Sequence, residues 1–411
     1  MTDGVLGDVW RRESAHVLGA LLRTHPDLAD CEDAAQEALL AAAQQWEYDG
    51  VPADPRAWLI RVARRRLIDQ HRGGSARARR ETADAIARRL DDPVEEADGT
   101  SAYDDSMQLL LLCCHGSLSR SSQVALTLRC VAGLTTEEIA AAYLVPASTM
   151  GQRLSRARAT LRDALRDTPF APPTPDEFPD RVASVLDVCH LVFNEGHTRT
   201  AGEELVGVEL AEEAIRLTRL LRAACPDNDE VTGALALMLL THARAPARID
   251  DAGDLVPLDE QDRSRWDPDL IAEGTSLLER VLPHGHVGRY QLQAAIAAVH
   301  AEAPTYADTD WLQICLLYGM LHQVAPSPAV TLNRAVAVAM TLGPDHGVAI
   351  VRDLLEHPAM QRHHRAHAVL AHLLEQLGDR DGAREHYALA ARLTRSAPEQ
   401  RYLNRRLAAL G

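Results

Sequence analysis

Apolar residues recur at helical spacing through most of the chain, and long runs of β-branched residues, which are typical of strands, are absent. Alanine, leucine and arginine, which all favour helices, are abundant. The pattern therefore predicts an all-α protein. At 411 residues the chain is too long for one small domain and suits two or three.

The clearest pair of predicted helices lies in residues 135–161. Thr135 and Glu138 have the spacing of a capping box, so a helix should begin directly after the threonine. Val145 should end that helix, because a residue that precedes proline is disfavoured in the α region. Pro146 can then open a second helix. Two short helices joined by a tight turn are typical of a DNA-reading helix-turn-helix.

The second of these helices combines an apolar stripe with an arginine-rich face. The stripe is expected to pack inward and consists of Met150, Leu154, Ala157 and Leu161. The opposite face should meet a DNA duplex through Ser148, Thr149, Gln152, Arg153, Arg156 and Arg158. Positions near the start of such a helix read base edges, and later cations contact phosphates. Taken alone, the segment also fits an ordinary helical hairpin with a solvated arginine face.

A second polar segment covers residues 33–72. An acidic-polar helix is predicted before the Gly50-Val51-Pro52 break, and a basic helix is predicted over 56–72, with six arginines and one acid. The apolar residues of the basic helix are Trp58, Ile60, Val62, Ala63 and Leu67. Such a helix can pack on one side and present cations to phosphate on the other, although a charge run of this kind is usually a solvated face.

Together the two segments resemble regions 2 and 4 of the sigma-70 family, specifically its compact extracytoplasmic-function (ECF) group. The resemblance rests on DAAQE at 33–37, on PRAWL through ARRRLID at 55–69, and on the helix-turn-helix, while residues 109–132 are similar to region 4.1. It implies that Asp33, Gln36 and Glu37 bind RNA polymerase core. It also implies that Arg61, Arg64 and Arg65, with the loop at 49–54, engage the minus-ten promoter element. Region 4 would read the minus-thirty-five element through Ser148, Thr149, Gln152, Arg153 and Arg156.

The domain organisation follows from breaks in the pattern. We expect region 2 at 1–73, a flexible glycine-rich and charged linker at 74–105, region 4 at 106–168 and a proline-rich linker at 169–179. Residues 180–411 should form a helical-hairpin domain similar to tetratricopeptide (TPR) repeats, with the clearest unit at 366–397 and a degraded neighbour at 332–355. This extension resembles the TPR-like tail of certain ECF sigma factors, through blocks such as VCHLVFNEGH at 188–197 and EQDRSRWD at 260–267.

These blocks contain polar residues that packing alone does not require. A candidate pocket consists of Asn194, Glu195, His197, Asp262, Arg263, Trp266 and Asp267. Its residues could bind a signal or partner, or could instead be helix caps and interhelix salt bridges. A metal or acid-base site would use Glu195, His197 and Asp262, but no nucleophile motif, phosphate loop or HExxH supports catalysis. We therefore expect no enzyme activity, no metal and no cofactor.

Charge and cysteine content narrow the interpretation further. The net charge of −16 means that any DNA contact must be local. Seven irregularly spaced cysteines fit a reducing compartment, and Cys113-Cys114-His115 is expected to be buried helix packing rather than a zinc site. No apolar stretch suits a signal peptide or membrane span, so a cytoplasmic protein without membrane contact is expected.

These observations predict a sigma factor that binds RNA polymerase core and promoter DNA and directs promoter-specific initiation. The C-terminal domain would regulate this activity or bind a protein or small-molecule regulator. The alternative is a helix-turn-helix transcriptional regulator with a TPR-like sensor domain.

Overall fold

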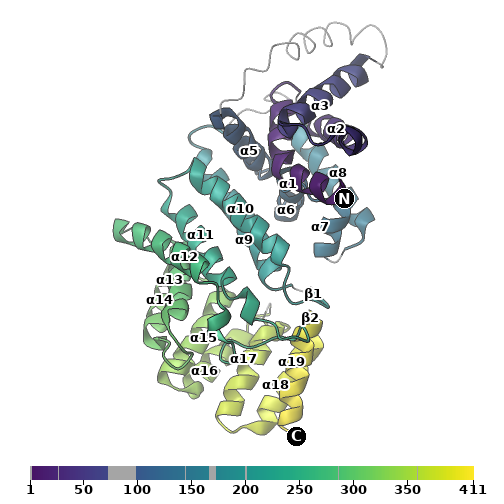
Figure 1. The fold of residues 1–411 in the computed structure, drawn as a ribbon. Helices are drawn as coiled ribbons and strands as arrows, with labels where there is room; N and C mark the ends of the chain where they lie inside the picture. Colours follow the sequence, from purple (N-terminus) through teal and green to yellow (C-terminus); the bar gives the residue numbers. More distant parts are fainter. Residues whose placement is uncertain are drawn as a thin grey trace. The chain divides into compact units, whose positions relative to one another are not determined.

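The computed structural model describes residues 2–25, 27–72, 99–143, 145–165, 173–199, 201–285, 287–358 and 360–411. Helices dominate these residues (Figure 1), and the all-α prediction is confirmed. The chain divides into two compact units, Met1–Val188 and Cys189–Gly411, and the division falls within α9 (Phe178–His197).

The N-terminal unit begins with a bundle of three helices, α1 (Thr2–Leu22), α2 (Leu28–Asp49) and α3 (Pro55–Arg72). Each helix packs against the other two. The basic helix predicted over 56–72 is therefore present as α3. Its fully buried stripe is Leu59, Ala63 and Leu67, whereas Trp58 is half-buried and meets Trp46 at 5.3 Å between ring centroids.

The remaining helices of this unit are α5 (Gly99–Cys113), α6 (Arg120–Leu126), the π-helical turn η1 (Thr127–Val131), α7 (Thr136–Ala142), α8 (Ala147–Ala164) and the first part of α9. α5 packs on α1, and Asp105 of α5 forms an ion pair with Arg23, which follows α1, at 3.0 Å. The predicted flexible linker falls mainly on residues 73–98, and much of the proline-rich linker on 166–172, both outside the described residues. α5 already begins at Gly99, within the expected linker.

The C-terminal unit is a succession of helices (Figure 1). Most of them pack against their neighbours in the chain, whereas α11 also packs extensively against α13, the second helix after it. The helices are α10 (Val208–Ala224), α11 (Asp229–His242), α12 (Pro268–Val281), α13 (Arg289–Glu302), α14 (Trp311–Val324), α15 (Pro328–Leu342), α16 (Pro344–Leu355), α17 (His364–Gln376), α18 (Arg380–Leu393) and α19 (Ala397–Ala409). Short 3-10 turns lie between them: η2 (Ala245–Ala247), η3 (Arg263–Arg265) and η4 (Leu282–His284). A short parallel pair joins β1 (Ala201–Gly202) to β2 (Arg395–Ser396).

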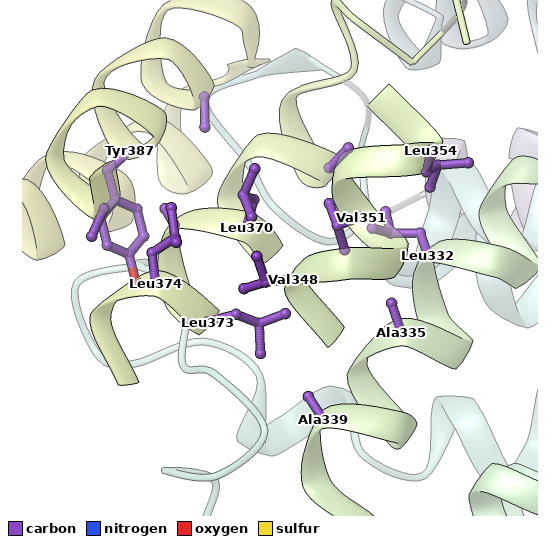
Figure 2. Close-up of a cluster of buried hydrophobic side chains, with 14 of the residues drawn as sticks. Leu332, Ala335, Ala339, Val348, Val351, Leu354, Leu370, Leu373, Leu374 and Tyr387 are labelled. Atoms are coloured by element: carbon purple, nitrogen blue, oxygen red, sulfur yellow. The ribbon is translucent and has the colours of Figure 1, made fainter. Parts of the chain in front are cut away.

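The last helices of this unit share one apolar core. Figure 2 shows its centre, where side chains of α15, α16, α17 and α18 converge. Tyr387 is 1% exposed, and its hydroxyl donates to Glu375 at 2.9 Å, so the one polar atom of the ring is satisfied. Gly378, with a φ of 80°, allows the left-handed turn between α17 and α18.

The predicted hairpin at 366–397 corresponds to α17 and α18, and 332–355 corresponds to α15 and α16. The small residues Ala371, Ala383 and Ala390 of these helices are fully buried in the shared core. The helical hairpins are thus present. Their assignment to the TPR class stays a prediction.

Candidate DNA-binding and polymerase-binding surfaces

The helix-turn-helix segment folds as its local sequence requires. Thr135 caps α7 by accepting from the backbone N–H of Glu138 at 3.1 Å, and the Glu138 carboxylate accepts from the Thr135 N–H at 2.7 Å. The predicted capping box is therefore confirmed. α8 then begins directly after Pro146.

The two faces of α8 divide as predicted from its periodicity. Its inward residues are Met150, Leu154, Ala157 and Leu161, each at most 2% exposed. Ser148, Thr149, Gln152 and Arg156 are exposed, and Arg153 is half-buried. Arg156 donates to Gln152 at 3.3 Å, which aligns both side chains along the outer face. A polar, cationic surface thus begins at the first turn of α8.

Arg158 does not belong to this outer surface, so its expected contact with the duplex is wrong for this arrangement. Its guanidinium donates twice to the Glu32 carboxylate of α2, from Nε at 2.5 Å and from Nη2 at 2.9 Å. Arg129 of η1 donates to the same carboxylate at 3.3 Å. The Glu32 side chain is only 7% exposed. Two arginines of the later helices are therefore held by one buried acid of α2.

The three arginines predicted to engage the minus-ten element differ in accessibility. Arg61 and Arg65 are exposed on α3. Arg64 is half-buried, and burial together with the neighbouring Arg23 lowers the pKa of its guanidinium, against the opposing effect of Asp105. Arg61 and Arg65 are consequently the two cations of this set that α3 presents most openly to solvent.

The polar face of α2 carries the residues that we expected to bind polymerase. Asp33 is exposed, while Gln36 and Glu37 are half-buried, and Glu37 pairs with Arg66 at 3.5 Å. Burial and the adjacent Glu32 raise the pKa of the Asp33 carboxyl. Leu40, one helical turn further on, is 65% exposed. The sequence analysis missed this leucine, although its helical spacing from Asp33 and Gln36 was a usable signal.

The end of α2 and the loop that follows it present two further exposed residues, Tyr48 in the last turn of α2 and Val51 in the loop. Tyr48 is 86% exposed and Val51 is 44% exposed. Asp54 caps α3 by accepting from the backbone N–H of Ala57 at 2.9 Å. An exposed aromatic ring therefore lies at the end of α2, directly before the loop that leads to the basic helix.

The candidate C-terminal residues do not all form one pocket. Asp262 caps η3 by accepting from the Ser264 N–H, and Asp267 caps α12 by accepting from the N–H groups of Asp269 and Leu270. These two aspartates are therefore helix caps, which was the alternative to a binding pocket. Asn194 is exposed and Glu195 is buried on α9. No group of three or more His, Cys, Asp or Glu side chains in the described part of the chain could hold a metal ion.

His197, Arg263 and Trp266 lie in a different environment, close to other cations. The Arg263 guanidinium lies over the Trp266 ring at 4.7 Å from its centroid, and that of Arg244 at 5.9 Å. Burial, Arg248 and Arg244 lower the pKa of His197. The sequence analysis missed Arg244 and Arg248, because isolated arginines in loops belong to no periodic pattern.

The cysteine-histidine cluster behaves as buried packing. Cys113 and Cys114 are fully buried in α5 and directly after it, and Cys114 contacts the Thr127 hydroxyl at 3.7 Å. Burial raises the pKa of the Cys114 thiol to about 12. Both features disfavour a reactive thiolate. None of the helices in the described ranges is long and apolar enough to cross a membrane.

Three segments of the chain match known protein families. Residues 9–77 match the model of sigma-70 region 2, residues 108–161 match that of sigma-70 region 4, and residues 181–282 match a family of unknown function, DUF6596. An uncharacterized protein of Rhizobium meliloti (strain 1021) is 41% identical over 397 residues, which cover 95% of this chain and 92% of that protein.

Two named relatives match the N-terminal part. The ECF RNA polymerase sigma factor SigK of Mycobacterium sp. (strain JLS) is 29% identical over 39% of this chain and 76% of its own length. The probable ECF RNA polymerase sigma factor SigI of Mycobacterium tuberculosis is 30% identical over 38% of this chain and 53% of its own length. With both sigma regions matched in order on the helices described above, the chain belongs to the sigma-70 family of RNA polymerase sigma factors, in its ECF group, and carries a C-terminal DUF6596 extension.

Proposed function

We propose that this sigma factor binds RNA polymerase core through the outer face of α2 and directs it to a specific set of promoters. Asp33, Gln36 and Glu37 supply the polar contacts, and exposed Leu40 adds an apolar contact at the same face. An apolar residue surrounded by polar groups is a common arrangement at the centre of a protein interface.

In this proposal α3 and the preceding loop act on the minus-ten element. Arg61 and Arg65 are exposed and can neutralise the DNA backbone, while Arg64 has less access. Tyr48 is 86% exposed and offers a ring on which an unpaired base can stack. Trp46 and Trp58 are more buried, so Tyr48 is the aromatic residue best suited to this role.

The minus-thirty-five element would be read by the start of α8. The observation that carries this proposal is the exposed face formed by Ser148, Thr149, Gln152 and Arg156 on a helix whose other face is buried. Because the whole chain is acidic at −16, binding must rest on such local surfaces rather than on overall charge.

The primary test is transcription by purified polymerase core from the protein's own upstream region. Full-length protein should produce transcripts that core alone does not. Asp33→Asn combined with Leu40→Ala should reduce core binding, with Glu47→Gln as a matched exposed change on the same helix. Promoter binding without core-dependent transcripts would instead establish the helix-turn-helix regulator.

Duplex binding tests the reading helix directly. Arg153→Ala and Arg156→Ala should each weaken binding to minus-thirty-five DNA by about 1–3 kcal/mol if they contact base edges. Arg162→Ala is the control, because Arg162 lies later on α8 and pairs with Asp27 at 3.4 Å. Equal affinity of all three variants and the wild type would remove α8 from the proposed role.

We further propose that the C-terminal unit regulates transcription by this sigma factor. Arg120 of α6 donates to Asp187 at 2.7 Å and to the Ser184 carbonyl at 3.0 Å, so the first part of α9 is bound to region 4. A truncated chain should therefore end at Val188, which preserves these contacts. A change in transcription on removal of Cys189–Gly411 supports regulation, and unchanged level and signal response contradict it.

A further inference from the structure

Three arginines gather where α11 ends and the loop towards α12 folds back. Arg244 and Arg248 flank η2, and Arg263 begins η3. The guanidinium groups of Arg244 and Arg263 both lie near the ring of Trp266, which is 5% exposed. We call Arg244, Arg248, Arg263 and Trp266 the arginine cluster.

No carboxylate in the described part of the chain forms an ion pair with any of these arginines. Burial and Arg263 lower the pKa of Arg244 to about 10. Burial, Arg244 and Arg365 lower the pKa of Arg248 to about 9, with Glu399 as the acid that opposes them. The cluster thus contains positive charges that repel one another in a poorly solvated place.

Glu399 cannot balance this charge, because it is already engaged elsewhere. Its carboxylate lies 2.9 Å from His364 Nε2, and it accepts from Arg365 at 3.1 Å and from the Thr394 hydroxyl at 2.9 Å. Nearby His300 adds no charge near neutral pH, since burial together with Arg244 and Arg263 lowers its pKa to about 4.

Two of the three arginines in the cluster donate hydrogen bonds to neighbouring parts of the chain. Arg263 donates to the carbonyls of His300 and Ala303, both at 2.5 Å, and so caps the end of α13. Arg248 donates to the His197 carbonyl and to the Thr198 hydroxyl. Arg263 and Arg248 therefore have clear structural roles.

Arg244 and Trp266 lack comparable partners. Among the described residues no hydrogen bond or ion pair engages the Arg244 guanidinium, and the buried Trp266 Nε1 has no acceptor. A buried donor without an acceptor is costly and rare in folded proteins, so it needs a specific explanation. Guanidinium groups bind carboxylates and phosphates through paired hydrogen bonds.

We propose that the arginine cluster binds a small anion that carries carboxylate or phosphate groups, with Arg244 as its main ligand. The Trp266 Nε1–H would supply a second donor, and the anion would relieve the repulsion among the three arginines. The proposal deepens the regulatory role suggested above for the C-terminal unit, because it names the chemical class of its effector.

The test uses full-length protein and two probes, inorganic phosphate and citrate, with sodium chloride at matched ionic strength. The unfolding temperature of the C-terminal unit should rise with the concentration of at least one probe and reach a plateau, since a ligand that binds the native state stabilises it. Phosphate alone or citrate alone would identify the class. No saturable shift beyond that of chloride with either probe would overturn the proposal.

Arg244→Gln separates binding from a structural role. In low-salt buffer without either probe it should be at least as stable as the wild type, because it removes a repelled cation that makes no hydrogen bond or ion pair among the described residues. Its affinity for the probe should fall at least tenfold, while Arg219→Gln, an exposed arginine of α10 that pairs with Glu273 at 2.6 Å, should bind normally. Destabilisation of Arg244→Gln without loss of affinity would assign Arg244 to the fold and refute the site.

A second readout keeps this proposal distinct from the proposed function. Binding is measured without polymerase, and transcription is then compared with and without the anion. Saturable binding through Arg244 that leaves transcription unchanged would preserve the site and refute its regulatory role.

Discussion

Glu32 is the residue whose replacement should most clearly loosen α8 from α2. Its carboxylate receives two hydrogen bonds from Arg158 and one from Arg129, across 126 and 97 residues of sequence. Glu32→Gln keeps the shape of the side chain but removes the charge. Two arginine side chains, which are only 24% and 15% exposed, would then lose their shared counter-ion.

The expected magnitude follows from this burial. Removing one partner of a buried ion pair costs about 3–5 kcal/mol, because the remaining charge stays poorly solvated. Arg129 retains a hydrogen bond to the Leu134 carbonyl at 3.0 Å, and both arginines keep some contact with water. We therefore expect the lower end, about 3 kcal/mol. Arg162→Gln is the matched control, because its pair with Asp27 is exposed and should contribute only about 0–1 kcal/mol.

Native-state hydrogen exchange on the full-length protein measures this opening directly, since it reports local unfolding helix by helix. A loss of about 3 kcal/mol corresponds to roughly 100-fold faster exchange of protected amides in α8 and η1. A double-mutant cycle of Glu32→Gln with Arg158→Gln should show coupling that the control pair lacks. The reasoning is wrong if Glu32→Gln leaves exchange in α8 within twofold of the wild type, or if Arg162→Gln accelerates it equally.

Three further predictions concern packing and charge. Gly19→Ala should destabilise the N-terminal unit by about 1–3 kcal/mol, because an added Cβ would lie 2.7 Å from the Cβ of Asp105; an unchanged denaturation midpoint would contradict this close packing. Tyr387→Ala should cost about 3–5 kcal/mol, whereas Tyr387→Phe, which loses only the bond to Glu375, should cost about 1 kcal/mol; denaturant unfolding that ranks the two equally would count against the core in Figure 2. Although burial opposes it, the basic neighbours of Glu399 lower its pKa from 4.5 to about 2, so its contribution is complete above pH 4.5 and is lost as the pH falls towards 2. Glu399→Gln should flatten this part of a stability–pH profile, and an unaltered profile would refute the assignment.

The parts of the fold that depend on local sequence could be predicted well. The capping box of Thr135 and Glu138 involves residues three positions apart, and it fixes the start of α7 without help from the rest of the chain. The inward stripe of α8 follows equally from periodicity. α3 has more apolar residues than its buried face can hold. Periodicity alone therefore could not show that Leu59 is fully buried and Trp58 is only half-buried.

The parts that depend on distant partners could not be predicted. Arg158 looked like one more DNA-facing cation, because its partner Glu32 lies on another helix far away in sequence. The sequence pattern assigns Asp262 and Asp267 to a pocket, whereas in the structure each caps the helical turn that follows it. For Asp267, its position directly before Pro268 is a local signal for such a cap. Arg244 carried no local signal at all.

The neighbouring residues Glu32 and Asp33 show why an acidic pair cannot be interpreted from sequence alone. Adjacent positions on a helix project about 100° apart, so one helix can direct consecutive side chains to different surroundings. Glu32 is buried against Arg158 and Arg129, whereas Asp33 is exposed on the face proposed to bind polymerase. Since Glu32 also helps to raise the pKa of Asp33, the two sites are linked electrostatically through a single helix. The polymerase binding that we propose for Asp33 and the contact that holds α8 at Glu32 therefore both involve the same part of α2, and any shift of this part would affect both.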